Sequence, residues 1–134
     1  MPSTFRYARA ESGQKYGAKK TEVDGHMFDS KAEAAHYCAL KQLEEAGVIR
    51  KLELQPKFFF GSGPGRLKIR TPKRPLGRAV TYTGDFSFIY KGKRWIQDVK
   101  GMDTDASRLR RALDEYFHGY IVHVVKKTGE LPPE

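Results

Sequence analysis

The chain has 134 residues, of which 25 are Lys or Arg and 16 are Asp or Glu, so its formal net charge is +9. This length fits one domain, and the surplus of positive charge favours a polyanionic partner. Hydrophobic residues make up 39% of the chain, which is enough for a packed core and excludes a disordered basic tail.

The single cysteine, Cys38, excludes an intrachain disulfide and a multi-cysteine zinc site, and it is typical of a reducing compartment. No apolar run approaches the roughly 20 residues that span a bilayer, and the N-terminus has no hydrophobic signal segment. We therefore expect a cytoplasmic protein that does not contact a membrane.

Residues 1–21 are polar and basic, with occasional aromatic side chains. Two interpretations stay open for this flexible arm, a disordered leader and an arm that contacts nucleic acid. Asp29 and Ser30 then predict the start of a helix over residues 31–46, and Gly47 predicts its end. The inward stripe of this helix consists of Glu33, Tyr37, Leu40 and Leu43, which places one carboxylate in line with the apolar face.

Residues 48–60 predict a strand that is broken or ends near Pro56. A Gly/Pro-rich basic segment follows at residues 61–78. No acidic residue lies between Glu53 and Asp85, and seven cations lie there instead: Lys57, Arg66, Lys68, Arg70, Lys73, Arg74 and Arg78. The segment is interpreted either as a solvated hairpin tip or as a loop that follows a phosphate backbone.

Residues 79–90 and 94–100 predict two strands joined by a short turn at residues 91–93. Caps within residues 103–107 predict a helix that ends near His118 and Gly119, with apolar positions at Leu109, Leu113, Tyr116 and Phe117. Residues 120–125 are apolar on both faces and predict a buried strand, reached by a right-handed parallel crossover. The expected fold is α/β, with the order αβββαβ, in a single domain over residues 22–128 followed by a tail at 129–134.

Two carboxylates are expected to meet on the paired strands. Asp98 and Lys100 leave the same face of their strand, whereas Val99 points the other way. If the turn has two residues, Asp85 falls opposite Asp98 or Lys100 on that face; a three-residue loop without a bulge would place it on the other face. Two neighbouring carboxylates repel one another unless a cation lies between them, and an all-oxygen site is one that Mg²⁺ or Mn²⁺ favours.

The chemistry expected of such a site is phosphodiester hydrolysis. A divalent cation held by Asp85, Asp98 and the Val99 carbonyl polarises a phosphodiester and activates water, and Lys100 offsets the developing charge. Glu33, on the inward stripe of the first helix, is expected to reach the same cluster either directly or through a metal-bound water. Two plainer interpretations stay open: Asp98 and Lys100 form an ordinary salt bridge, or Glu33 only completes a capping box with Ser30.

At these residues the sequence resembles the PD-(D/E)xK nuclease superfamily, in particular its small phage-encoded, Holliday-junction-resolvase-like members. The resemblance runs from about Tyr16 to Val125 and rests on four segments: FDSKAEAAHY with Glu33, LELQPKFFF with Gln55, YTGDF with Asp85, and IQDVKG with Asp98 and Lys100. Two departures are Gly84, where the signature has proline, and Asp98, where glutamate is more frequent.

The resemblance implies a restriction-endonuclease-like core and a Mg²⁺-dependent or Mn²⁺-dependent DNA endonuclease, homodimeric and selective for branched or distorted DNA. It would act in phage DNA recombination, in the bacterial host cytoplasm. It also implies metal binding by Glu33, Asp85, Asp98 and Val99, a role for Lys100 in water attack, and a contact of Gln55 with the water or metal shell.

The positive side chains expected to contact DNA are Arg66, Lys68, Arg70, Lys73, Arg74, Arg78, Arg108 and Arg111. The arm or the face with Arg108, Arg110 and Arg111 is the alternative positive surface. Two alternative functions stay open, a non-catalytic nucleic-acid-binding protein and an RNA-directed nuclease. A zinc enzyme is not expected, because His36 and His123 fit better as hydrogen-bonded partners inside a helix and a strand.

Overall fold

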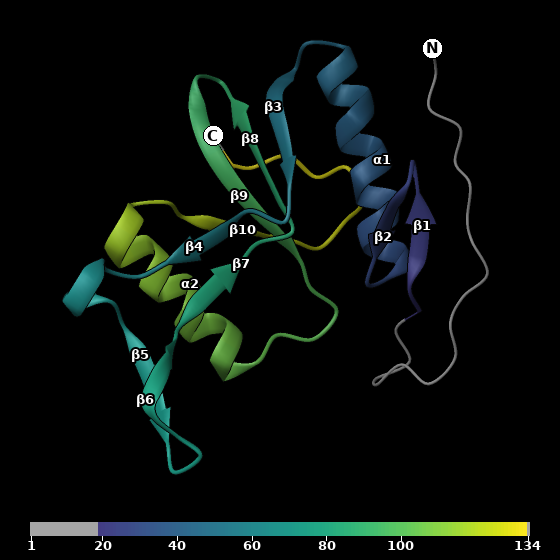
Figure 1. The fold of residues 1–134 in the computed structure, drawn as a ribbon. Helices are drawn as coiled ribbons and strands as arrows, with labels where there is room; N and C mark the ends of the chain where they lie inside the picture. Colours follow the sequence, from purple (N-terminus) through teal and green to yellow (C-terminus); the bar gives the residue numbers. More distant parts are fainter. Residues whose placement is uncertain (1–18, 134) are drawn as a thin grey trace.

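The computed structural model describes residues 19–133 of the chain (Figure 1). Its elements follow in the order β1 (Thr21–Val23), β2 (His26–Phe28), α1 (Lys31–Glu45), β3 (Ile49–Leu54), β4 (Lys57–Phe59), η2 (Gly63–Gly65), β5 (Lys68–Thr71), β6 (Arg74–Ala79), β7 (Thr81–Thr83), β8 (Phe86–Tyr90), β9 (Lys93–Val99), α2 (Asp105–His118) and β10 (Val122–Val125).

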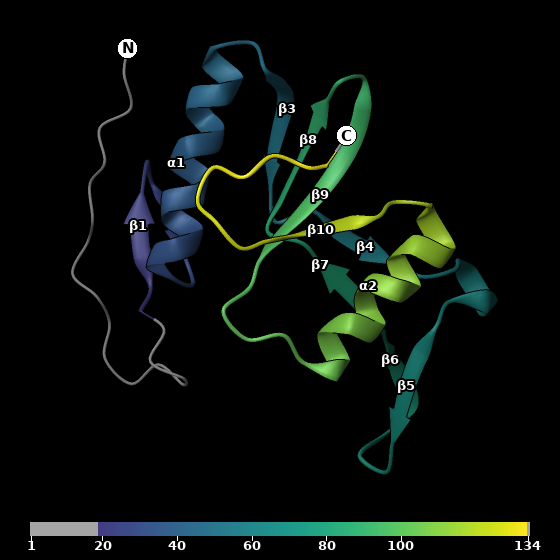
Figure 2. The same ribbon diagram turned by 180° about the vertical axis from the view of Figure 1, so that it is seen from behind.

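A four-stranded mixed sheet forms the centre of the fold, with the strand order β10-β9-β8-β3. β10 runs parallel to β9, whereas β8 pairs antiparallel with both β9 and β3. The segment from β9 through α2 to β10 is therefore a parallel crossover, which the view from behind shows beside the sheet (Figure 2). The expected α/β class with a mixed central sheet is confirmed.

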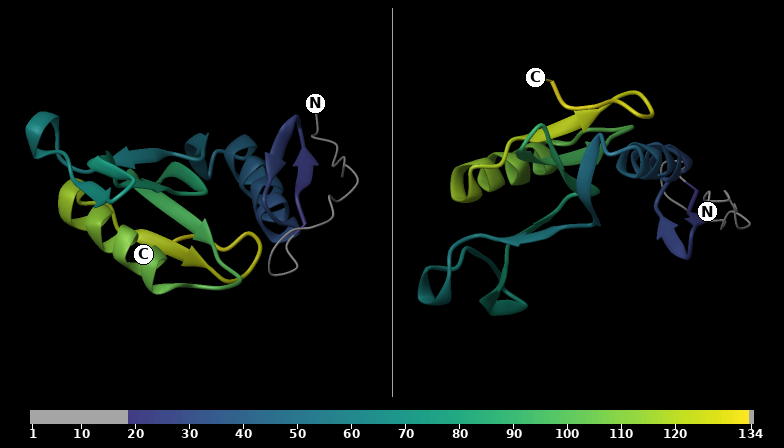
Figure 3. Two further views of the ribbon diagram at one scale, coloured as in Figure 1. Left: turned by 60° about the horizontal axis from the view of Figure 1, so that its bottom comes forward. Right: turned by 90° about the horizontal axis from the view of Figure 1, so that it is seen from above.

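The larger hydrophobic core lies between α1 and one face of this sheet. It joins α1 through Ala34 and Leu40 to Phe88 of β8 and Trp95 of β9. Figure 3 shows α1 and the β1–β2 pair packed together at one side of the molecule. Val99 packs at the border of this cluster, as expected from its position between Asp98 and Lys100.

A smaller core lies on the opposite face of the sheet, because neighbouring residues of a strand point to opposite sides and Ile96 follows Trp95. Ile96 packs there with Tyr82 of β7, and Leu113 of α2 joins from the helix. β4 and β7 form a separate antiparallel pair, and their side chains extend the smaller core beyond the four-stranded sheet. One strand, β9, thus supplies side chains to both layers.

Both helices begin and end as the sequence predicts. The Ser30 hydroxyl accepts from the Glu33 amide at 3.1 Å at the start of α1, and the Thr104 hydroxyl accepts from the Ser107 amide at 3.1 Å at the start of α2. α1 ends at Glu45 with Gly47 in the left-handed region, and α2 ends at His118 with Gly119 in that region.

Two expectations about side-chain burial are wrong. Of the four apolar positions named in α2, only Leu113 packs into the core, while Leu109, Tyr116 and Phe117 are exposed and Asp114 is buried instead. β10 is an edge strand, so its residues 122–124 are only half-buried. Most of β10 is only half-buried because it lies at the edge of the sheet. Most apolar side chains of α2 are exposed because this helix packs mainly against β7, a strand of only three residues.

The β1–β2 hairpin precedes α1 and adds Val23 and Phe28 to the larger core. Its turn is Asp24-Gly25, with φ of 51° and 80°, and an Asp-Gly pair is the usual residue choice for this tight turn. The sequence therefore held the signal, although no strand was predicted there. Of the predicted arm, residues 1–18 lie outside the described residues, and Thr21 already begins β1.

The strand predicted over residues 79–90 is interrupted at Gly84 and Asp85, which separate β7 from β8. The partner strand is interrupted at the same level, because β3 ends at Leu54 and β4 begins at Lys57. Backbone hydrogen bonds join the two interruptions: the Gln55 amide donates to the Asp85 carbonyl at 3.0 Å, and the Gly84 amide donates to the Pro56 carbonyl at 2.9 Å.

The basic segment at residues 61–78 forms η2 and most of the β5–β6 hairpin, which projects from the body (Figures 1 and 2). Its prolines are compatible with this hairpin: Pro64 lies in η2, and Pro72 lies in the turn between Thr71 and Arg74. Pro75 lies in a ribbon of two strands, where one edge needs no donor. Of the two interpretations of residues 61–78, the hairpin therefore describes how the backbone folds.

Residues 129–132 pack against the body. Leu131 joins the larger core, and Pro132 is buried. Within residues 19–133, no helix has the length and apolarity needed to cross a membrane.

Candidate active site

The register of β8 and β9 brings the two predicted aspartates together. Tyr90 pairs with Lys93, so the turn has two residues, Lys91 and Gly92, and the ladder continues to the pair Phe86 and Gln97. Asp85 directly precedes this last pair and Asp98 directly follows it, so the two aspartates lie side by side where the ladder ends. The two-residue turn is therefore the alternative that the structure adopts.

Hydrogen bonds fix both carboxylates at the end of the sheet. The Asp85 amide donates to Oδ1 of Asp98 at 3.1 Å, and the Val99 amide donates to Oδ2 of Asp85 at 2.8 Å. Oδ2 of Asp98 accepts from the Tyr82 hydroxyl at 2.8 Å. Each carboxylate thus accepts from a backbone or side-chain donor of another segment, and Asp98 is only 1% exposed.

Glu33 brings a third carboxylate to this end of the sheet from the first turn of α1. It is 5% exposed, and burial followed by the negative charge of Asp85 raises its pKa to about 8. Burial followed by the charge of Asp98 raises the pKa of Asp85 to about 7. Asp29 adds to both shifts. These shifts indicate an excess of negative charge in a site largely removed from water.

The Glu33 carboxylate is not used for capping. Ser30 accepts from the Glu33 amide, but across residues 19–133 no hydrogen bond or ion pair engages the Glu33 carboxylate. A capping box needs that carboxylate to accept from the Ser30 amide in return. The cap therefore explains the hydrogen bond of the Glu33 amide, but it gives the Glu33 carboxylate no role in the helix.

Lys100 lies just beyond β9 and is half-buried. Its positive charge lowers the pKa of both Asp85 and Glu33, although by less than burial raises them. Within the described part of the chain, Lys100 forms no salt bridge with either aspartate or with Glu33. A lysine near three carboxylates but not bonded to one keeps its ammonium group available to a ligand.

The donor set fits a hard divalent cation in its chemistry, since Asp85, Asp98 and Glu33 offer oxygens only. In residues 19–133, however, no three His, Cys, Asp or Glu side chains are grouped closely enough to hold a metal ion as they stand. The raised pKa values of Asp85 and Glu33 are the observation that favours a cation, because its charge would offset the repulsion between these groups.

The backbone of Gln55, and not its side chain, contacts the segment that carries Asp85. Its amide bonds to the Asp85 carbonyl, its φ is 51°, and its side chain is exposed in a hollow that Gly25 to Phe28 also line. The structure therefore shows Gln55 closing the strand and shows no contact of its side chain with the three carboxylates.

Gly84 is required by packing. A Cβ atom at this position would lie 2.7 Å from Cγ2 of Ile96 and 3.3 Å from the Tyr82 hydroxyl. Any larger residue, proline included, would therefore displace the side chain of Ile96 or Tyr82. This close packing explains why glycine fits at this position.

The cations predicted to contact DNA divide into two groups. Arg108 and Arg111 both pair with Asp103, with the shortest contact at 2.8 Å from Nη2 of Arg111, and Arg108 also pairs with Asp105 at 3.3 Å, so two carboxylates compensate the two positive charges. The remaining six lie in or near the β5–β6 hairpin, and all except the half-buried Arg66 are exposed: Arg66, Lys68, Arg70, Lys73, Arg74 and Arg78.

Sequence reasoning missed Tyr82, which bonds Asp98, and Asp114, whose two buried carboxylate oxygens have no hydrogen-bond partner in the described residues. It also missed Gln97, whose amide links His36 at 2.6 Å to His123 at 2.9 Å. A polar residue inside an apolar strand was the available signal for Gln97. The two histidines are hydrogen-bonded partners, as the sequence suggested.

The sequence matches the family described as "Protein of unknown function (DUF1064)" over residues 13–128, and the chain belongs to this family. No curated protein and no solved structure matches the chain.

Proposed function

We propose that this chain is a divalent-metal-dependent endodeoxyribonuclease of the PD-(D/E)xK type, selective for branched or distorted DNA. The observation that carries the proposal is the placement of Asp85 beside Asp98, whose carboxylate accepts from the Asp85 amide, with Glu33 close enough for the charge of Asp85 to raise its pKa. The basic hairpin supports a polyanionic substrate, and the resemblance of the four sequence segments supports the chemistry.

Each residue has a distinct task in this proposal. Asp85, Asp98 and Glu33 would hold Mg²⁺ or Mn²⁺, with the Val99 carbonyl as a further oxygen donor. The cation, when bound, supplies Lewis acidity to the scissile phosphate and to water. Lys100 orients the attacking water and compensates the charge that develops on the phosphate oxygens. The Tyr82 hydroxyl and the Asp85 amide hold the carboxylate of Asp98 in place.

The test is a cleavage assay on a four-way junction, a duplex, single-stranded DNA and RNA, with Mg²⁺, Mn²⁺ or EDTA. We expect metal-dependent cleavage of DNA, most efficiently of the junction. Asp85→Asn and Asp98→Asn should abolish cleavage and keep or strengthen DNA binding, because each change removes a metal ligand and a negative charge that faces phosphate. Glu45→Gln, which neutralises an exposed carboxylate at the end of α1, is the matched control.

Lys100→Ala separates this proposal from the salt-bridge interpretation. We expect it to lose cleavage while it still binds metal. Normal turnover by Lys100→Ala or by either aspartate variant would overturn the assignment. DNA binding without cleavage under any metal would instead support the non-catalytic nucleic-acid-binding protein, and cleavage of RNA alone would support the RNA-directed nuclease.

A further inference from the structure

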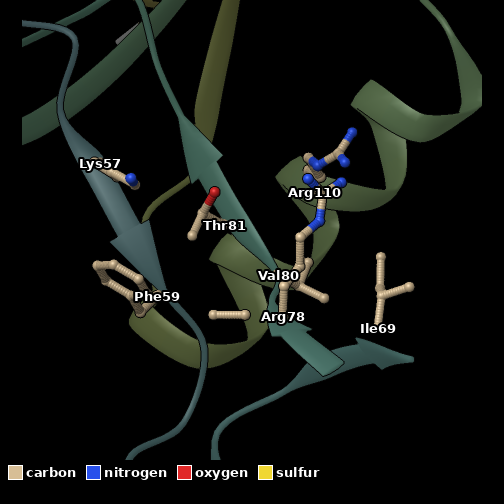
Figure 4. A pocket seen from close by; sticks show the side chains of 8 residues that line it. Lys57, Phe59, Ile69, Arg78, Val80, Thr81 and Arg110 are labelled. Atoms are coloured by element: carbon tan, nitrogen blue, oxygen red, sulfur yellow. The ribbon is translucent and has the colours of Figure 1, made fainter. Parts of the chain in front are cut away.

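A pocket of about 330 Å³ lies between the β4–β7 pair, the base of the β5–β6 hairpin and α2 (Figure 4). Its walls combine apolar side chains of Phe59, Ile69 and Val80 with the hydroxyl-bearing Thr81. Three cations from distant parts of the chain also line it: Lys57, Arg78 and Arg110. This volume is at the lower end of the range of small-ligand sites.

The charge of this pocket is uncompensated. No Asp or Glu lines it, and in the described residues none of its three cations forms a salt bridge. The contrast within α2 is sharp, because Arg108 and Arg111 pair with Asp103 whereas Arg110 lies in the pocket. Figure 4 shows the guanidinium groups of Arg78 and Arg110 at the same end of it. Two adjacent unpaired guanidinium groups form a natural site for a phosphate.

One short strand joins this pocket to the candidate active site. Thr81 of β7 lines the pocket, and the next residue, Tyr82, points to the other side and bonds Asp98. Thr81 and Asp85 are four residues apart, so their Cα atoms are separated by about 14 Å at most. Phosphates along one strand of a duplex rise about 3.4 Å each along the helix axis, and because the backbone also winds around this axis, neighbouring phosphates lie farther apart than that rise. A strand whose scissile phosphate is at Asp85 therefore has another phosphate, fewer than four nucleotides away, within reach of the pocket.

We propose that this pocket binds one backbone phosphate of a DNA strand, together with its sugar, a few nucleotides from the bond that the acidic site cleaves. Arg78 and Arg110 contact the phosphate oxygens, and the apolar walls contact the sugar. The inference deepens the proposed nuclease function, but its binding step requires neither metal nor cleavage. It also assigns a task to Arg110 that its neighbours Arg108 and Arg111 do not share.

The test measures binding in EDTA with the full chain and a labelled four-way junction. The Arg78→Gln/Arg110→Gln variant should reduce the slope of log affinity against log salt by about 0.9, the value for the one phosphate charge that the protein no longer neutralises. A control variant, Arg50→Gln/Lys127→Gln, removes two exposed cations elsewhere and should leave the slope nearly unchanged. Arg78→Lys/Arg110→Lys should keep most of the slope and lose the bidentate geometry. Thermal melting of each variant checks that it folds.

A scan of single methylphosphonate substitutions along one strand locates the phosphate. In the wild type, one neutralised position should weaken binding at least about fivefold, since a hydrogen bond to a charged group is removed there. In Arg78→Gln/Arg110→Gln, that same position should no longer matter. If every position acts equally in both proteins, or if the double variant behaves as the control does, the pocket is not a phosphate site.

Thymidine 5′-monophosphate as a competitor separates a strand from a free nucleotide. We expect millimolar concentrations to leave junction binding almost unchanged; displacement at micromolar concentrations would identify a free nucleotide and overturn the proposal. The two proposals fail separately. A wild type that cleaves nothing but shows the methylphosphonate effect contradicts the nuclease alone, whereas cleavage without that effect contradicts the pocket alone.

Discussion

The Tyr82 hydroxyl donates a 2.8 Å hydrogen bond to Oδ2 of Asp98, and the two side chains are 4% and 1% exposed. Removal from water strengthens this bond and fixes the direction of the carboxylate. Tyr82 therefore acts through Asp98, as a positioning residue.

Tyr82→Phe should lower cleavage about 10-fold to 100-fold and raise the Mg²⁺ concentration that gives half-maximal rate, because partners of metal ligands contribute effects of that size. The measurement is a Mg²⁺ titration of single-turnover rates. Tyr37→Phe is the matched control, since it removes a tyrosine–aspartate bond, to Asp24 at 3.3 Å, elsewhere in the fold. An equal shift in both variants would mean that Tyr82 only supports the fold.

Without a divalent cation, the stability of the protein should fall as the pH rises from about 4 to about 8. The folded-state pKa values of Asp85 and Glu33 are raised to about 7 and about 8, so the folded chain holds protons that the unfolded chain has already released. Thermal melting across this range, with and without Mg²⁺, measures the effect.

Mg²⁺ should raise the melting temperature most at the alkaline end, where both carboxylates must ionise. Asp85→Asn/Asp98→Asn should lose this increment, and Glu33→Gln should flatten the metal-free decline. Stabilisation of the double variant equal to that of the wild type would place the metal elsewhere.

Asp114 should be a destabilising residue. Its carboxylate is buried without a hydrogen-bond partner in the described residues, and burial raises its pKa to about 6. Asp114→Asn should therefore stabilise the protein at pH 8, by on the order of 1–3 kcal/mol, and much less at pH 4, where the buried carboxyl of the folded state is protonated.

Thermal melting of Asp114→Asn beside Glu115→Gln, an exposed neighbour, isolates the effect of burial. If Asp114→Asn is instead less stable at pH 8, the carboxylate has a partner in solution.

The β5–β6 hairpin should contribute DNA affinity and no chemistry. Changing Arg70, Lys73 and Arg74 together to Gln should weaken binding to every DNA sequence and lower the salt slope by roughly two to three units, while cleavage at saturating enzyme persists. All three side chains are exposed, so the fold should be unaffected.

Salt titrations on one junction and one duplex, together with single-turnover rates, measure both effects. The control changes three cations distant from the hairpin: Arg50, Lys51 and Lys127. An unchanged slope in the hairpin variant would indicate that the hairpin is merely solvated, and a loss of saturated rate would show that it also takes part in cleavage.

The sequence predicted those features that depend on local pattern. The caps that start the helices at Ser30 and Thr104 follow from short-range patterns, and a two-residue turn was expected to place Asp85 on the same face as Asp98 and Lys100, opposite one or the other. These inferences need only neighbours in the chain or one register, which the turn residues Lys91 and Gly92 supply.

The features of the site that the sequence did not predict depend on contacts between segments that are distant in the chain. Nothing in the residues near Tyr82 shows that its hydroxyl reaches Asp98, because this contact depends on the break between β7 and β8. Likewise, Arg110 and Arg111 are adjacent and chemically identical, yet one lies in a pocket and the other pairs with Asp103. Only the position of α2 against the sheet distinguishes them.

The hydrogen bonds around Gln97 have a consequence for how the protein is made. The Gly129 amide donates to Nδ1 of His36 at 3.0 Å, across 93 residues of sequence, so the imidazole proton is on Nε2 and faces the Gln97 side-chain oxygen. During synthesis α1 leaves the ribosome long before residue 129 exists. Until then His36, which is 1% exposed in the folded protein, lacks this donor. We therefore expect α1 to stay open to solvent and to chaperones on the nascent chain, and to dock fully only once residue 129 has been made and can reach His36.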